Sequence, residues 1–194
     1  MKAKIQKLFI RLFRLPSRPS AIMAKLNLKP PLKVVEIGVS KGANAFDMLY
    51  HMDIEKIYLV DPYKYENGIQ GQHRIKGELE DFKFDAREKL RRWWDKIVFI
   101  YEPLTRKVIH DLIPDWIDFV YIDGDHSTKS VVKDIIHSMY ITRNGGIIGG
   151  HDIQYESVRK AVNWIFGKNN YNVIGLDWWV YVHRKNIKEG SFVE

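Results

Sequence analysis

The sequence predicts an α/β protein in which a mostly parallel sheet is covered by helices on both faces. From residue 32 onward, short apolar runs rich in Val and Ile alternate with stretches of helical pattern. Hydrophobic residues make up 45% of the chain, the ordinary share of a globular protein, which excludes a disordered or fibrous chain. A length of 194 residues fits one domain with a core large enough to fold alone.

Strand-like and helix-like segments follow one another along this part of the chain. The expected strands are 33–39, 56–60, 97–101, 117–122, 146–149, 173–176 and 178–183. The stretches of helical pattern are 44–51, 81–94, 106–112, 127–141 and 156–166. The last two strands come close together with no helix between them, so we expect one of them to be antiparallel.

The positive charge of the chain is concentrated at its start. The formal net charge is +7, and nine Lys or Arg residues precede Glu36, the first acidic residue. The remaining 22 basic and 24 acidic residues nearly balance, which argues against a nucleic acid as the main substrate. Apolar residues from Ile5 to Phe13 recur at helical spacing between these charges, which predicts a basic amphipathic helix. Residues 1–15 would suit an anionic membrane surface or an acidic partner, or would pack on their own domain or a second subunit.

Prolines that follow this helix mark a linker, so we divide the chain into a basic segment and linker over 1–31, a domain over 32–184 and a tail over 185–194. The chain has no Cys, which excludes a disulfide framework, a Cys-based zinc site and a Cys nucleophile. No apolar run reaches the roughly 18 residues of a membrane span, and the N-terminus does not resemble a secretory signal. We expect a cytoplasmic protein, with peripheral membrane contact through the basic segment left open.

The first two strands end in features that suit a nucleoside. The first strand leads into Glu36-Ile-Gly38-Val39-Ser40-Lys-Gly42, where two glycines let the backbone turn tightly and approach a ligand. The second strand ends at Asp61 and Pro62, and a carboxylate about 20 residues after such a loop is placed to accept hydrogen bonds from ribose hydroxyls. The two features together indicate an adenosine-type ligand. The loop lacks the G-x-G-x-x-G spacing, which disfavours a nicotinamide oxidoreductase.

The fourth and fifth strands end in groups that suit catalysis. Asp123-Gly124-Asp125-His126 follows the fourth strand and His151-Asp152 follows the fifth, and parallel neighbours lie about 4.8 Å apart. Asp123, His126, His151 and Asp152 can therefore converge on one small volume, and carboxylates with imidazole fit a divalent cation such as Mg, Ca or Mn. The alternative is that the aspartates cap helices and bind an organic cofactor. His126 is the candidate general base, with Asp123 beside it as the second catalytic residue.

Four motifs of the chain, EIGVSKG, LVDPY, FVYIDGDHS and GGIIGGHD, resemble in this order those of class I S-adenosylmethionine-dependent methyltransferases. The resemblance covers about residues 32–184. Within that class the chain is most similar to metal-dependent sugar O-methyltransferases of the macrocin and mycinamicin type, with cephalosporin hydroxylase-like proteins as cousins. This resemblance implies a Rossmann-like three-layer sandwich with a seven-stranded, mostly parallel sheet and an antiparallel last strand.

The resemblance also implies roles for individual residues. The glycine loop frames the methionine end of the cofactor, Asp61 holds the ribose, and Glu102 lies near the adenine. Asp123 lies beside the methionine moiety and ligates a metal, and His126 acts as base. In the sugar enzymes the second ligand pair is acidic at both positions, whereas this chain has His151-Asp152 there. The implied cofactor-binding set is Glu36, Gly38, Val39, Ser40, Gly42, Asp61, Pro62, Glu102, Asp123 and Gly124.

These features predict S-adenosylmethionine-dependent O-methylation of a small hydroxylated acceptor of sugar, polyketide or phenolic type, with a divalent metal as an open second cofactor. Two alternatives remain: a metal-dependent hydroxylase-like enzyme on the same scaffold, and a non-catalytic, membrane-associated partner protein that binds the cofactor. The oligomeric state is also open, with a homo-oligomer among the possibilities.

The acceptor side is the least readable part of the site. Residues 63–77 are polar and long enough for a lid or a solvated loop, and the side chains there that could touch an acceptor are Tyr63, Tyr65, His73 and Arg74. The pairs Trp93-Trp94 and Trp178-Trp179 indicate core packing. Because neighbouring side chains of a strand face opposite ways, Trp178 and Trp179 should lie on opposite faces of the sheet.

Overall fold

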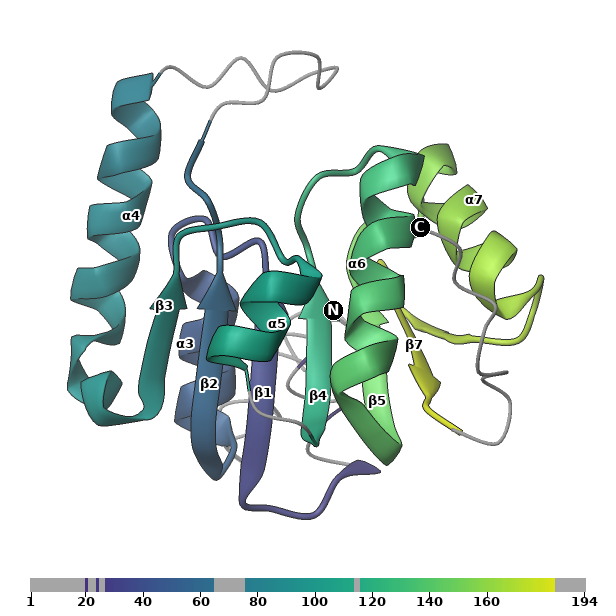
Figure 1. The fold of residues 1–194 in the computed structure, drawn as a ribbon, viewed down its shortest axis with the longest axis horizontal. Coiled ribbons are helices and arrows are strands. Elements are labelled where there is room, and N and C mark those ends of the chain that lie inside the picture. Colours follow the sequence, from purple (N-terminus) through teal and green to yellow (C-terminus); the bar gives the residue numbers. More distant parts are fainter. Residues whose placement is uncertain (1–19, 21–23, 25–26, 65–75, 114–115, 184–194) are drawn as a thin grey trace, which may run out of the picture.

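A seven-stranded sheet forms the centre of the computed structural model, which describes residues 20, 24, 27–64, 76–113 and 116–183 (Figure 1). The strands are β1 (Leu32–Ile37), β2 (Ile54–Val60), β3 (Ile97–Ile100), β4 (Ile117–Ile122), β5 (Thr142–Gly150), β6 (Asn172–Ile174) and β7 (Asp177–Tyr181). The helices are α3 (Ala43–His51), α4 (Lys76–Leu90), α5 (Arg106–Leu112), α6 (Thr128–Ile141) and α7 (Glu156–Phe166), with a 3-10 helix, η1 (Arg91–Lys96), after α4.

The order of the strands in the sheet is β3-β2-β1-β4-β5-β7-β6. Strands β1 to β5 pair in parallel, whereas β7 is antiparallel to both of its neighbours, β5 and β6. The predicted mostly parallel sheet with one antiparallel strand is therefore confirmed. As a consequence, β7 begins, rather than ends, at the edge of the sheet where β1 to β5 end.

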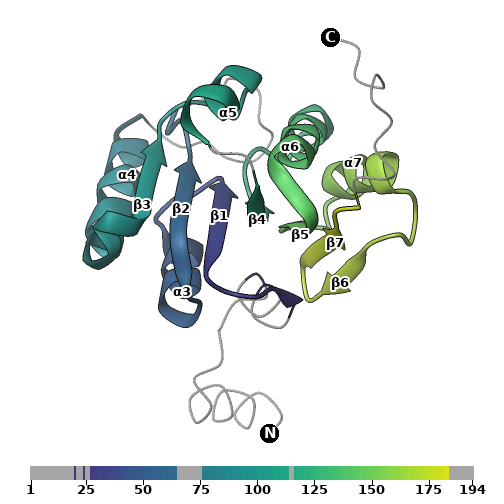
Figure 2. The same cartoon turned by 60° about the horizontal axis from the view of Figure 1, so that its bottom comes forward.

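Helices cover both faces of the sheet, which confirms the predicted three layers (Figures 1 and 2). Helices α5, α6 and α7 pack on one face and share a core with Val35 of β1, whereas α3 and α4 pack on the other face with the preceding residue, Val34. Successive residues of β1 thus enter opposite cores, as the two-residue repeat of a strand requires. The burial of both faces explains why the central strands β1 and β4 are mostly apolar in sequence.

Two helices on the first of these faces begin at side chains that accept hydrogen bonds from the free amides of the first turn. The hydroxyl of Thr105 accepts from the backbone N–H of Val108 at 3.2 Å, and that of Ser127 accepts from Ser130 at 3.3 Å. Ser127 fixes the start of α6, so the loop between β4 and α6 holds only the residues from Asp123 to His126 before that cap.

The tryptophan pairs differ in their packing. Trp178 is buried in the core under α5, α6 and α7, and Trp179 packs against the other core, so the prediction of opposite faces is confirmed. Trp93 packs against the core under α3 and α4, but Trp94 is 48% exposed. The prediction of core packing is therefore wrong for Trp94, whose ring is instead covered by the guanidinium of Arg87, 4.9 Å from the ring centroid.

The basic amphipathic helix and the tail over 185–194 lie outside the described residues, as do Tyr65, His73 and Arg74 of the expected lid. Of the expected linker, Ala24 and Leu28 are buried in the core under α3 and α4, and the Ser20 hydroxyl donates a hydrogen bond to the side chain of Asn44. Within the described ranges, no helix is both long and apolar enough to span a bilayer.

Candidate active site

A cavity of about 470 Å³ opens at the carboxyl ends of β1, β2, β4 and β5. The strand order reverses between β1 and β4, because β2 and β3 lie on one side of this pair and β5 lies on the other. Open α/β sheets bind ligands at such a reversal, where two loops diverge and leave a crevice. The volume of the cavity lies in the ordinary range for sites that hold a small molecule or cofactor.

The loop after β1 approaches β4 so closely that it requires glycine. Gly38 has a φ of 84°, and a Cβ built there would lie 2.1 Å from the carbonyl oxygen of Asp123. The Asp123 amide in turn donates to the carbonyl of Ile37 at 2.7 Å. Gly42, with a φ of 68°, then opens α3 close to Leu90 of α4. The two glycines of the motif thus bring the loop against both the end of β4 and α4.

Asp61 at the end of β2 holds this loop in place. One carboxylate oxygen, Oδ2, accepts the backbone N–H groups of Val39 and Ser40, both at 2.9 Å. The other oxygen, Oδ1, accepts the N–H of Tyr63 at 2.9 Å, and the Tyr63 hydroxyl donates to the Ser40 carbonyl at 2.7 Å. A carboxylate has about four acceptor positions, so the carboxylate keeps capacity for a ligand after these three hydrogen bonds. Burial, with the nearby charges of Asp61 and Glu36, raises the pKa of Tyr63 and keeps its hydroxyl a donor.

The residues of the predicted cofactor set fall into two groups in the structure. Those that line the cavity are Gly38, Ser40, Asp61, Pro62, Asp123 and Gly124. Those outside its lining are Glu36, Val39, Gly42 and Glu102. Glu36 is buried, and its Oε1 accepts from the Asn44 amide at 3.0 Å, whereas Glu102 is exposed while its neighbours Pro103 and Leu104 line the cavity.

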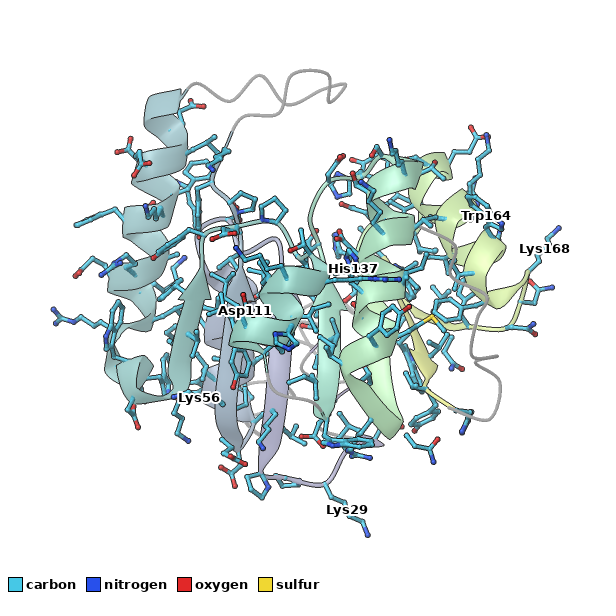
Figure 3. All side chains as sticks on the ribbon, in the orientation of Figure 1. Lys29, Lys56, Asp111, His137, Trp164 and Lys168 are labelled. Atoms are coloured by element: carbon cyan, nitrogen blue, oxygen red, sulfur yellow. The ribbon has the colours of Figure 1, made fainter. Side chains whose placement is uncertain are left out.

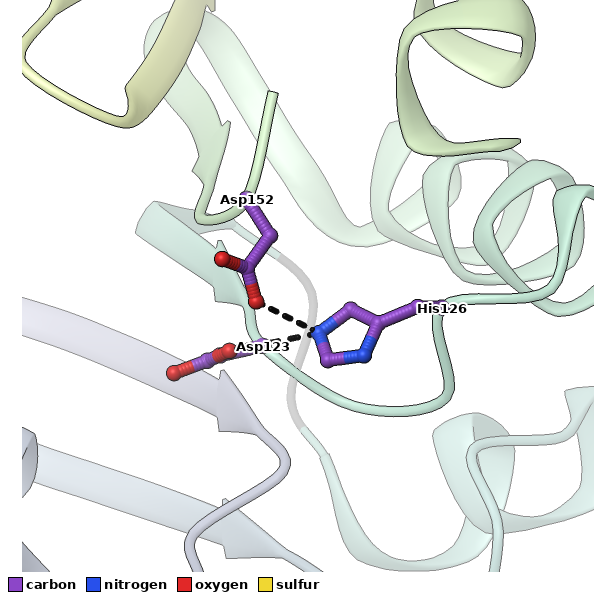
Figure 4. Close-up of side chains that lie close together, drawn as sticks. All are labelled: Asp123, His126 and Asp152. Atoms are coloured by element: carbon purple, nitrogen blue, oxygen red, sulfur yellow. Dashed lines mark ion pairs between the residues drawn. The ribbon is translucent and has the colours of Figure 1, made fainter. Parts of the chain in front are cut away.

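Asp123, His126 and Asp152 meet at the side of the cavity formed by the ends of β4 and β5 (Figure 4). His126 Nε2 lies 2.8 Å from Asp152 Oδ2 and 3.9 Å from Asp123 Oδ1. One ligand atom from each of the three residues lies within 4.8 Å of the other two, as binding of one metal ion requires. The sequence predicts His151 rather than His126 as the imidazole ligand, and the structure gathers His126 into this group instead.

His151 lies on the other side of Asp152. Its Nδ1 is 3.0 Å from Asp152 Oδ1 and 4.0 Å from Asp123 Oδ1, and its Nε2 is 3.5 Å from Oδ1 of Asp177. Asp152 therefore stands between two imidazoles, and it does so with a left-handed φ of 62°. Its Oδ1 also accepts the side-chain amide of Gln154 at 2.6 Å.

The carboxylates around His126 favour its charged form. Its interaction with Asp123 is the largest contribution that raises the pKa of His126, burial opposes the rise, and the charges of Asp152 and Asp125 add to it. The imidazolium that forms when His126 accepts a proton is therefore stabilised in place. This is the electrostatic requirement for a general base whose charge develops during the reaction.

Several residues that the sequence analysis did not single out also line the cavity: Lys64, Leu79, Ser130 and Asp134. Ser130 and Asp134 lie four residues apart on α6, so they share one helix face, directly after the Asp-Gly-Asp-His segment. That spacing is a signal that the sequence offered. Leu79 of α4 and Lys64 flank residues 65–75, and no periodicity in the sequence connects them to the site.

Comparison with known proteins identifies the family of this domain. Residues 35–153 match the family model Methyltransf_24, a methyltransferase domain. An uncharacterized protein of Acanthamoeba polyphaga mimivirus is 28% identical over 154 residues, which are 76% of this chain and 64% of the viral protein. The chain thus spans 64% of the length of this curated relative.

Solved structures share the fold at low identity. The O-methyltransferase TomG from Streptomyces achromogenes, in complex with S-adenosylmethionine, superposes with a TM-score of 0.59 at 14% identity and covers 90% of this chain and 86% of its own. An O-methyltransferase from Bacillus cereus in complex with S-adenosylhomocysteine superposes with a TM-score of 0.60 at 12% identity, covering 90% and 88%. With the family match over more than half of its length, this chain belongs to the methyltransferase-domain family Methyltransf_24 and has the fold of the class I S-adenosylmethionine-dependent methyltransferases.

Proposed function

We propose that this chain transfers the methyl group of S-adenosylmethionine to a hydroxyl oxygen of a small molecule, with His126 as the general base. One observation carries the proposal. A single cavity is lined both by the loop residues Gly38 and Ser40 with Asp61 and by the polar group of Asp123, His126 and Asp152. A cofactor held at the loop and an acceptor held at the polar group would therefore share one space.

The reaction requires no covalent bond between the substrate and the protein. The acceptor oxygen attacks the sulfonium methyl carbon, the carbon–sulfur bond breaks, and S-adenosylhomocysteine leaves with the electron pair on sulfur. Alignment of the two reactants can supply up to about 7–11 kcal/mol of the lowering of the barrier. The protein must also take the hydroxyl proton, and we assign this role to His126, whose charged form the surrounding carboxylates favour.

Asp152 orients this base. Since His126 Nε2 lies 2.8 Å from Asp152 Oδ2, the proton of the acceptor would be taken at the other ring nitrogen, Nδ1. The carboxylate holds the ring in one orientation and stabilises the imidazolium, as in other histidine–carboxylate pairs.

The donor set also suits a divalent cation. Asp123 and Asp152 offer carboxylate oxygens and the adjacent histidines offer imidazole nitrogen, a combination that fits Mg or Mn. When bound, the ion would lower the pKa of an acceptor hydroxyl and fix its position.

The test has a binding step and a turnover step. We expect S-adenosylhomocysteine, but not NAD, to give a saturable heat signal on calorimetric titration. We then expect methyl transfer from labelled S-adenosylmethionine to at least one member of a panel of sugars, polyketides and phenols, measured with and without a chelator. His126→Gln should lower turnover by about 10²–10⁴-fold and leave S-adenosylhomocysteine affinity unchanged.

His110→Gln is the matched control, because the side chain of His110 on α5 is 89% exposed and lies outside the cavity lining. It should change neither turnover nor cofactor affinity. Absence of heat with S-adenosylhomocysteine would reject the cofactor assignment, and full turnover by His126→Gln would reject the base.

A further inference from the structure

We propose that Ser20, which precedes the predicted domain, is a positioning residue for the cofactor loop, residues 38–42 between β1 and α3. Ser20 acts through Asn44 and Glu36, whose side chains join the two ends of this loop. The inference deepens the proposed function, because its effect on cofactor affinity rests on that function. Its effect on the loop itself can be tested without any cofactor.

The segment that contains Ser20 packs against the domain with one face. Ser20, Ala24 and Asn27 are helical, and the N–H of Leu28 donates to the Ala24 carbonyl at 2.9 Å, a bond between residues four apart as in an α-helix. Ser20, Ala24 and Leu28 follow at intervals of four residues, so they share one face of this segment. All three are buried, and Ala24 and Leu28 enter the core under α3 and α4. This face is therefore turned toward the domain, with Ser20 as its polar member.

Burial of the Ser20 hydroxyl requires a hydrogen-bond partner, and Asn44 supplies it. The hydroxyl donates to Oδ1 of Asn44, the second residue of α3, and the Asn44 NH₂ group donates to Glu36 Oε1 at 3.0 Å. Glu36 is 1% exposed and Asn44 is 6% exposed. Because a carboxylate can only accept, the Asn44 amide must turn its NH₂ group toward Glu36 and its oxygen toward Ser20. The series of bonds thus has one direction, from the hydroxyl through the amide to the carboxylate.

The hydrogen bond between Asn44 and Glu36 closes the base of the cofactor loop. Glu36 lies in β1, two residues before Gly38, and Asn44 lies in α3, two residues after Gly42. The bond therefore joins the strand that enters the loop to the helix that leaves it. Gly38 and Gly42 have left-handed φ angles of 84° and 68°, and glycine adopts many other conformations as readily. A fixed base limits the conformations that these glycines allow the loop to adopt.

A loop that is ordered before the cofactor arrives binds it more tightly, because binding then requires less ordering. Gly38 and Ser40 of the loop line the cavity, whereas Ser20, Asn44 and Glu36 lie outside its lining. Without the Ser20 hydroxyl, the buried Asn44 oxygen loses this donor, and the amide is held less firmly toward Glu36. Ser20 would therefore influence the cofactor through the shape of the loop and not through contact.

Reversing the direction of this series of bonds tests the path. Asn44→Asp keeps an acceptor for Ser20 but places a second carboxylate against Glu36, so the base of the loop should open. Adding Glu36→Gln supplies an amide that can donate to the new carboxylate, while Ser20 still donates to it. In calorimetric titrations of the full chain, we expect S-adenosylhomocysteine affinity to fall by about 10–100-fold in Asn44→Asp and to recover to within about threefold of the wild type in the double variant.

Ser20→Ala tests the first bond of the series. We expect S-adenosylhomocysteine affinity to fall by about 2–10-fold, as for the loss of one neutral hydrogen bond, and amide exchange at Val39 and Ser40 to accelerate. In an Asn44→Ala background, Ser20→Ala should change neither quantity further, because Ser20 acts through Asn44. Urea denaturation establishes that each variant is folded under the conditions of both measurements.

Tyr181→Phe is the matched control for a hydrogen bond lost from the same segment. The Tyr181 hydroxyl donates to Asn27 Oδ1 at 2.7 Å. Tyr181 is the last residue of β7, which begins at the carboxyl end of β5, so this bond lies toward the opposite edge of the sheet and outside the cavity lining. The variant should keep the wild-type affinity and the wild-type exchange at Val39 and Ser40.

The outcomes separate this inference from the proposed function. Unchanged exchange at Val39 and Ser40 in Ser20→Ala, or an equal effect of Ser20→Ala with and without Asn44, would overturn the positioning role. Equal losses in Tyr181→Phe and Ser20→Ala would assign the effect to packing of the whole segment, and a double variant that does not recover would exclude the path through Glu36. Failure of the wild type to bind S-adenosylhomocysteine would reject the cofactor assignment, while the exchange rates would still decide whether Ser20 acts on the loop.

Discussion

Gly38 shows how closely two functional segments approach each other at the scale of a single residue. Its φ of 84° lies in the left-handed region, and a Cβ there would lie 2.1 Å from the Asp123 carbonyl oxygen. The first value makes any side chain strained, and the second leaves no space for one. The residue therefore brings the loop after β1 into contact with Asp123, the residue that follows β4.

Replacing Gly38 with Ala should destabilise the fold and abolish S-adenosylhomocysteine binding. The left-handed conformation costs a non-glycine residue about 1–2 kcal/mol, and overpacking adds typically about 1–3 kcal/mol, so we expect a loss of about 2–5 kcal/mol in unfolding free energy. Urea denaturation followed by circular dichroism measures the loss.

Gly145→Ala is the matched control for this prediction. Gly145 has a similar φ of 75°, but a Cβ there would meet its nearest atom at 3.5 Å. Its substitution should cost only the conformational part, about 1–2 kcal/mol, and leave cofactor binding intact. Equal losses for the two variants would show that the approach to Asp123 is looser than the structure indicates.

At the scale of the element, the loop between β1 and α3 is held in its conformation by Asp61, the residue that follows β2. Asp61 accepts the N–H groups of Val39, Ser40 and Tyr63, so the shape of the loop depends on a residue outside it. Hydrogen bonds to a charged acceptor contribute about 1.5–3 kcal/mol each, enough to fix the conformation of so short a segment.

Asp61→Asn should loosen this loop while leaving the sheet intact. The amide has one acceptor oxygen in place of two and no charge, so the N–H groups of Val39 and Ser40 lose part of their bonding. We expect S-adenosylhomocysteine affinity to fall by about tenfold or more, because at least one charge-assisted bond is lost, and amide exchange at Val39 and Ser40 to accelerate. Asp53→Asn, at an exposed position just before β2, should change neither quantity. An unchanged exchange rate at Val39 and Ser40 would show that the loop holds its shape without Asp61.

The elements differ in how much of them the sequence could predict. Strands β1 to β4 were predictable because most of their residues are apolar, whereas only residues 146–149 of β5 (Thr142–Gly150) were predicted, because that strand begins with polar residues. The residues just after β1, β2, β4 and β5 could be assigned to the site because ligands bind at the carboxyl ends of parallel strands. Asp177 could not be found by that rule. It is the first residue of its strand, and the antiparallel direction of β7 brings the start of that strand to the carboxyl end of β5.

The choice between His126 and His151 was also beyond the sequence. Both follow a strand and lie beside an aspartate, and the resemblance to the sugar methyltransferases implies His151, in the second ligand pair, as the imidazole ligand. The structure separates them through contacts with residues distant in the chain, since the Asp177 carboxylate, 3.5 Å from Nε2 of His151, comes from β7. Side-chain contacts across elements have no periodicity in a sequence, so no pattern predicts them.

At the scale of the whole molecule, the sheet lies between two hydrophobic cores, and the candidate site lies at the edge where the parallel strands end. Groups outside the cavity lining can therefore alter the stability of the domain without entering the chemistry. His137 of α6 is such a group (Figure 3): its Nδ1 is buried and has no hydrogen-bond partner among the described residues. Burial lowers the pKa of His137, its interaction with the Leu104 backbone opposes this, and the charges of Arg106 and Lys133 lower it further.

The lowered pKa of His137 predicts a loss of stability in mild acid. Because the folded protein disfavours protonated His137, the unfolded chain binds the proton more readily, so the contribution is intact above the unfolded pKa of about 6.5 and declines as the pH falls below it. We expect His137→Gln to flatten the decline of unfolding free energy between about pH 6.5 and 5, measured by urea denaturation at each pH. His110→Gln, at the exposed position on α5, should keep the slope of the wild type. If both variants follow the wild-type slope, His137 is protonated as easily in the folded protein as in the unfolded chain, and its burial carries no penalty.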